Sequence, residues 1–222
     1  MVALLLHRYV SEPVPPEAVT DATPFTQYVG TILSVWGATP GQLVHALGLS
    51  EGGPVDAQYA CDPMGANESS EAYVGPLSAD GEVLVVFGNP RCGDSGGKEG
   101  DAARSLLEAL SARFGRCAVA SCSKYAVYYW GCAEGGKIER FVATGALDDA
   151  RAWWFEGEER PDEEAAKLRM NGKYDASWPD PALKWLQQWR VAQGAPASEH
   201  DTIELPGPGI AGYVGLRWAA EG

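Results

Sequence analysis

Ser95 is the residue whose surroundings are most typical of a reactive side chain. It lies in a Gly-Asp-Ser-Gly-Gly sequence at 93–97. A serine hydroxyl attacks a carbonyl when a neighbouring base removes its proton, and glycines allow backbone N–H groups to form an oxyanion hole beside it. The chemistry that this sequence would support is therefore hydrolysis through a covalent intermediate.

The same letters surround the nucleophile of chymotrypsin-like serine proteases, which also need a histidine and a buried aspartate on an all-β chain. Here His45 lies in LVHALG, which predicts a helix, and Lys98 stands where those proteases have a proline. The residues after Ser95 also predict a helix. We therefore interpret 93–97 as a glycine-rich loop, and a hydrolase that uses Ser95 stays as the alternative.

Phosphate and metal sites are not indicated. A P-loop needs serine or threonine after its Gly-Lys pair, but Lys98 is followed by Glu99, and Cys92 occupies the place of the first glycine. The chain has five cysteines without a Cys-x-x-Cys pair, and three scattered histidines. We expect no cofactor, no metal, no catalytic residue and no disulfide framework, which fits a reducing cytoplasm.

The charge of the chain restricts its partners. The formal net charge is −13 and the sequence pI is near 4.6, so the chain should repel nucleic acid and anionic membranes and attract basic surfaces. The first apolar run is only Val2–Leu6 and lacks the features of a signal peptide. No apolar run approaches the ~20 residues of a membrane helix. We expect a cytoplasmic protein that binds neither nucleic acid nor membrane.

The most acidic stretch is 147–164, where eight carboxylates and two arginines give a local charge of −6. It contains an aromatic run at 153–155, and neighbouring residues of a strand face opposite sides, so we expect one tryptophan in the core and one exposed. An exposed tryptophan among carboxylates would suit a basic partner; a solvated acidic helix start is the other interpretation. The predicted partner-binding residues are Trp153, Trp154, Glu156, Glu158, Glu159, Asp162 and Glu163.

The helix and strand patterns of the sequence predict an α+β fold that would position these residues. Its helices pack on a mixed or antiparallel sheet whose central meander spans about 116–155. A Gly135-Gly136 hairpin turn divides the meander, and the apolar spacing over 101–114 predicts the clearest helix, with Asp101 as its N-cap. Thr-Pro pairs predict helices over 23–36 and 41–47, and EVLVVF at 82–87 predicts a strand. The loop at 50–70 is a candidate boundary in an otherwise single domain, 1–222.

Residues 110–165 resemble a family of uncharacterised bacterial proteins that accompany secreted toxins and are thought to act as immunity proteins. The matching features are LSARFGR at 110–116, an aromatic strand from Tyr125 to Trp130, a glycine turn at Gly136, Arg140, and the acidic WFEGE and PDEE sequences. The resemblance implies a protein that neutralises a cognate toxin by direct binding, and carries no catalytic residues with it. A toxin with a basic active cleft would suit the charge of this chain; a non-catalytic subunit or adaptor of a bacterial assembly is a further alternative. The oligomeric state is not indicated.

Overall fold

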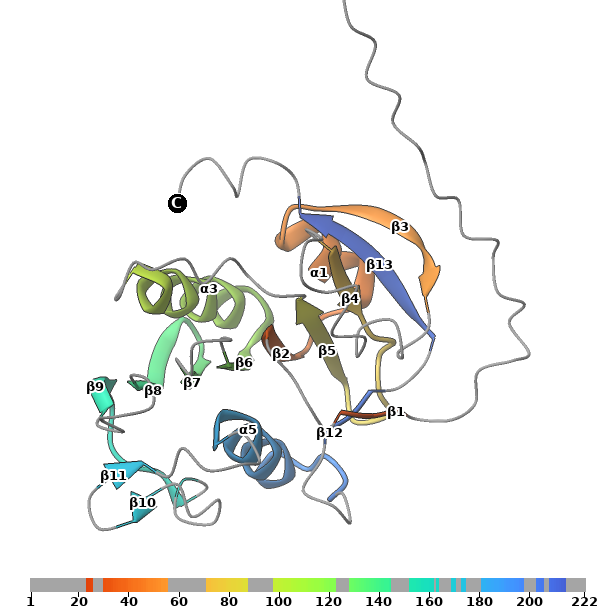
Figure 1. Cartoon of the computed structure of the whole chain (residues 1–222). Coiled ribbons are helices and arrows are strands. Elements are labelled where there is room, and N and C mark those ends of the chain that lie inside the picture. Colours follow the sequence, from red (N-terminus) through yellow and green to blue (C-terminus); the bar gives the residue numbers. More distant parts are fainter. Residues whose placement is uncertain are drawn as a thin grey trace, which may run out of the picture.

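A nine-stranded antiparallel sheet organises the chain (Figure 1). The computed structural model describes residues 23–25, 30–55, 71–87, 98–122, 128–144, 152–161, 163, 169–170, 173–174, 181–197, 203–205 and 208–214. Within these described residues three helices pack on the sheet, which confirms the α+β prediction. Its strands follow one another in the order β3 (Leu49–Val55), β13 (Gly209–Val214), β4 (Glu71–Val74), β5 (Glu82–Phe87), β2 (Gly30–Trp36), β6 (Arg116–Cys122), β7 (Tyr128–Glu134), β8 (Lys137–Thr144) and β9 (Ala152–Glu156).

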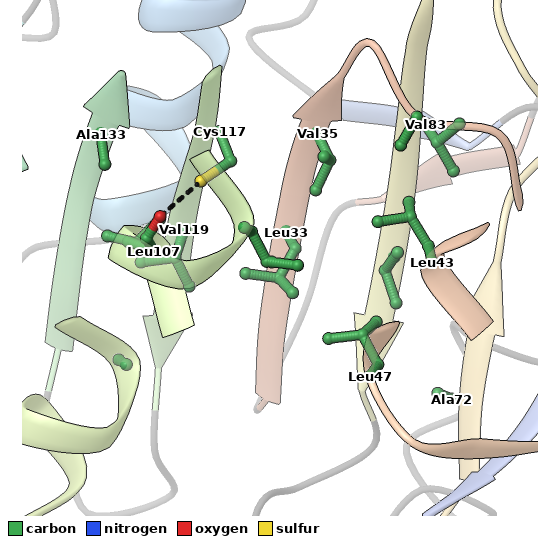
Figure 2. Packing of buried hydrophobic residues seen from close by; sticks show 14 of the residues in the cluster. Leu33, Val35, Leu43, Leu47, Ala72, Val83, Leu107, Cys117, Val119 and Ala133 are labelled. Atoms are coloured by element: carbon green, nitrogen blue, oxygen red, sulfur yellow. Dashed lines mark hydrogen bonds between the residues drawn. The ribbon is translucent and has the colours of Figure 1, made fainter. Parts of the chain in front are cut away.

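The two faces of the sheet are covered by different helices. Helices α1 (Pro40–Ala46) and α3 (Lys98–Phe114) pack on one face, where their leucines meet the side chains of β2, β5 and β6, as Figure 2 shows. Helix α5 (Pro181–Ala192) covers the other face, with Trp185 and Trp189 buried against the sheet. Two short two-stranded pairs complete the described elements: β1 (Thr23–Phe25) with β12 (Ile203–Leu205), and β10 (Arg169–Met170) with β11 (Lys173–Tyr174).

The predicted meander is confirmed, because β6, β7, β8 and β9 are consecutive in the chain and adjacent in the sheet. The turn between β7 and β8 uses Gly135 and Gly136 at φ values of 57° and 84°. A side chain at either position would be strained in this left-handed conformation. The hairpin brings β8 beside β7 and leaves β9 as the last strand of the sheet.

The predicted helix over 23–36 is wrong, since β1 and β2 occupy most of this segment. Strand β2 lies in the middle of the sheet with both faces buried, so its apolar residues do not alternate with polar ones. The same Thr-Pro signal is correct at Thr39, where the Thr39 hydroxyl and the Gln42 side chain form a reciprocal capping box. No Glu or Gln stands three residues after Thr23.

Two further boundaries differ from the sequence prediction. The segment predicted as a loop from residue 50 begins with strand β3, which pairs with β13 near the end of the chain. Helix α3 begins at Lys98, three residues before the predicted N-cap Asp101. The glycine-rich sequence at 93–97, including Ser95, lies outside the described residues.

Candidate partner-binding edge of the sheet

Strand β9 lies at one edge of the sheet that the described strands form. It pairs with β8 in antiparallel register, with Phe155 opposite Val142 and Glu156 opposite Phe141. Among the described strands it has no neighbour on its other side. An edge strand exposes one row of backbone N–H and C=O groups, so this side of the molecule can accept a further strand.

Phe155 is the most exposed large apolar residue in the described part of the chain, with 61% of its surface accessible. Its partner Val142 belongs to the core beneath α5, and directly opposed residues share a face, so Phe155 lies on the α5 side of the sheet. Helix α5 packs on β6 and β7 rather than on this edge. The Phe155 ring instead lies 5.8 Å from the guanidinium of Arg140, within the range of a cation–π contact.

The Arg140 guanidinium that contacts the Phe155 ring belongs to a buried ion pair with Glu163. Arg140 on β8 and Glu163 are 3% and 2% exposed. The guanidinium donates two hydrogen bonds to the Glu163 carboxylate and a third, of 2.7 Å, to the carbonyl oxygen of Gly157. Glu163, which the sequence placed among the partner-binding residues, is thus the buried counter-ion of Arg140 and does not belong to the exposed surface.

Gly157 allows the chain to leave β9 and pass over Arg140. Its φ of +79° lies in the left-handed region, and a Cβ at this position would overlap the carbonyl oxygen of Glu139. Only glycine therefore fits between β9 and the residues that follow. The turn places its carbonyl oxygen on the Arg140 guanidinium and returns the chain towards Glu163.

Glu156 lies on the opposite face of the edge, towards α3. Arg104 of α3 donates to both of its carboxylate oxygens, at 2.6 Å and 3.0 Å, and also forms a 3.1 Å ion pair with Glu108. The hydrogen bonds from Arg104 lower the pKa of the Glu156 carboxyl below its usual range, with a smaller Coulombic contribution from the same charge. This carboxylate therefore stays ionised in mildly acidic solution.

The edge carries more negative than positive charge. Glu158 and Glu159 are exposed, and Arg160 forms an ion pair of 2.6 Å with Glu139. Among the described side chains around β9, five carboxylates and two guanidinium groups are accessible or partly accessible, a balance of −3: Glu108, Glu139, Glu156, Glu158 and Glu159 against Arg104 and Arg160. We call these seven residues, together with Phe155, the β9 edge surface.

The structure brings Glu156, Glu158 and Glu159 to one edge. Trp153 and Trp154 belong to β9, but their side chains, like Asp162, lie outside the described part of the chain. Phe155 and Arg140 are not among the partner-binding residues predicted from the sequence. Arg140 could have been noticed, because it stands at a core-facing position of β8, two residues from Val142.

The two cysteines whose side chains are described offer no reactive centre. Cys117 pairs with Ala133 and Cys132 with Ala118, so their side chains lie on opposite faces of the sheet. The Cys117 thiol donates to the carbonyl oxygen of Leu107 at 3.3 Å (Figure 2). Burial raises the pKa of this thiol to about 12. Within the described residues no three potential metal ligands cluster.

We expect Cys117 to resist alkylation in the folded protein. With a pKa of about 12, almost no thiolate forms at pH 8, and the side chain is fully buried. Iodoacetamide treatment at pH 8, followed by peptide mass spectrometry, should find Cys117 unmodified in native protein and modified in urea. Rapid labelling under native conditions would show that α3 opens readily from the sheet.

Comparisons with protein-family models, with curated proteins and with solved structures give no significant match. No helix within the described ranges is long and apolar enough to span a bilayer.

Proposed function

We propose that this chain is a binding protein whose β9 edge surface contacts a basic protein. The observation that carries the proposal is Phe155, a large aromatic residue that is 61% exposed on an open sheet edge. Aromatic residues at the centre of an interface contribute a large share of binding energy. Phe155 meets this requirement because its ring is held over Arg140 while most of its surface remains accessible.

The charge around Phe155 supports a basic partner. Exposed carboxylates follow Phe155 on the same segment, and others lie across the edge on the α3 side; among the described side chains the balance is −3. The whole chain has the same sign, with a net charge of −13. Such a field accelerates the approach of a basic protein and disfavours acidic ones.

The form of this function that we favour is an immunity protein that neutralises a secreted bacterial toxin. The resemblance of residues 110–165 to the immunity-protein family motivates this choice. Most of the β9 edge surface belongs to that segment, and the remaining residues, Arg104 and Glu108, lie on α3 beside it. A toxin that acts on nucleic acid needs a basic cleft, to which an acidic, aromatic edge is complementary. The product of the gene adjacent to that of this chain is the first partner to test.

Charge reversal at Glu158 should slow association with that partner. Glu158 is exposed, and at low salt we expect Glu158→Lys to reduce the association rate about 3- to 10-fold, with a weaker dependence on salt. Asp80→Lys is the matched control, because Asp80 is also exposed but lies in the turn before β5, on the other half of the sheet. Surface-based binding kinetics over a series of salt concentrations would measure both variants.

Two results would contradict the proposal. Equal slowing by Glu158→Lys and Asp80→Lys would mean that the partner responds to net charge alone and does not contact the β9 edge surface. No complex at low salt would exclude the adjacent gene product as the partner, and with it the immunity function in this form.

A further inference from the structure

We infer that the partner contributes an extended segment that pairs with β9 through its backbone and lengthens the sheet by one strand. This inference rests on the proposed function and specifies how the partner is held. Strand addition to an exposed sheet edge gives affinity through main-chain hydrogen bonds and specificity through alternate side chains. The sheet formed by the described strands has two edges, β3 and β9, and they differ in ways that decide between them.

Strand β3 is protected against strand addition. It contains Pro54, which has no N–H to donate, and two glycines, and its register with β13 is interrupted between Ile210 and Gly212. Prolines and bulges are the devices by which natural sheets prevent pairing at an edge. The sequence of β9, AWWFE, has neither proline nor glycine. Its single irregularity lies near Ala152, so Trp154, Phe155 and Glu156 pair with β8 in regular register.

The two faces of the edge define the chemistry of the added segment. Phe155 lies on the α5 side, whereas Glu156 and Glu108 lie on the α3 side, where Arg104 bridges them. Side chains of a paired strand alternate between faces and lie within contact distance of the residues opposite. The segment therefore carries apolar residues against Phe155 and basic residues towards the carboxylates, in alternation.

A second copy of this chain is a poor occupant of the same edge. Pairing β9 with β9 would bring together two edges whose described side chains each carry −3, in chains that each carry −13. Like charges facing each other across strands are destabilising. A basic extended segment has the opposite charge and needs only the length of a short strand, since β9 has five residues.

The test uses a synthetic peptide, about seven residues long, in which lysine and valine alternate. Its control has the same sequence but carries N-methyl groups on two adjacent central amides, which blocks both edges of the peptide and keeps its charge and side chains. We expect the unmethylated peptide to bind at least about tenfold more tightly than the control, because each lost backbone hydrogen bond weakens binding. Hydrogen exchange should slow at the amides of 152–156 with the unmethylated peptide only.

Variants of the protein provide a second measurement. Phe155→Ala should weaken binding of the unmethylated peptide about tenfold, as expected for an aromatic anchor. Leu77→Ala is the matched control, since Leu77 is 50% exposed but lies between β4 and β5, away from β9. Both residues are exposed, so both variants should remain folded.

Two results would overturn strand addition without overturning the proposed function, and a third would overturn both. Equal binding of the two peptides, without slower exchange in β9, would overturn strand addition and leave charge-based binding intact. Binding of the adjacent gene product without protection of the β9 amides would do the same. If neither the peptides nor that product binds, the inference and the proposed function both fail.

Discussion

Glu163→Ala is expected to lower the free energy of unfolding by about 3–5 kcal/mol, because it removes the carboxylate that pairs with the buried Arg140 guanidinium. Arg140 is 3% exposed, and both of its hydrogen bonds to Glu163 would be lost together. The bond to the carbonyl oxygen of Gly157 would remain, but it does not neutralise the charge of Arg140. Urea unfolding followed by circular dichroism would measure the loss.

The control for this variant is Glu139→Ala, which removes an ion pair of similar length at the surface. Glu139 is 41% exposed at its side chain and pairs with Arg160 at 2.6 Å. An exposed pair contributes at most about 1 kcal/mol. If Glu163→Ala cost no more than Glu139→Ala, the Arg140 site would be more hydrated than its burial indicates.

The Glu163→Ala variant should also weaken partner binding. Arg140 holds Phe155 from beneath and holds the chain after β9 through Gly157, so loss of Glu163 would loosen both the ring and the residues that carry Glu158 and Glu159. We expect the loss of affinity to persist under conditions where the variant is folded. Phe155 thus depends on a residue that the sequence placed at the surface.

The meander could be predicted because its signals are local. Gly135-Gly136 marks the turn, and the strands on either side are rich in aromatic and β-branched residues. The order of the remaining strands could not be predicted. Strand β13 pairs between β3 and β4, and this depends on contacts between residues more than 130 positions apart, which no local pattern encodes.

The sequence could predict that the candidate site is acidic, but not which of its carboxylates are exposed and which are buried. The acidic stretch shows in the sequence that Glu156, Glu158 and Glu159 belong to one segment. It could not distinguish these carboxylates from Glu163, because burial of Glu163 depends on Arg140, 23 residues away on a neighbouring strand. A sequence window counts charges, whereas the fold decides which of them are neutralised in the interior.

A second buried pair allows stability and binding to be separated. Arg190 of α5 donates to both carboxylate oxygens of Glu82 on β5, at 2.6 Å and 2.7 Å, and the two residues are 6% and 4% exposed. Arg190 also donates to Gln187, and Ser34 donates to Glu82. This pair joins α5 to the sheet at β5, and three strands separate β5 from β8.

Arg190→Met should therefore lower the free energy of unfolding by about 3–5 kcal/mol, as much as Glu163→Ala, because it leaves the Glu82 carboxylate buried without the arginine that pairs with it. Urea unfolding would measure this loss. Since Arg190 does not contact the β9 edge surface, the folded variant should bind the partner with unchanged affinity. Equal losses of affinity in the two variants would mean that binding follows global stability, and that Arg140 and Glu163 have no particular role beneath Phe155. If Glu163→Ala binds the partner more weakly and Arg190→Met, at the same stability, does not, the Arg140–Glu163 ion pair is what holds the β9 edge surface in its binding conformation.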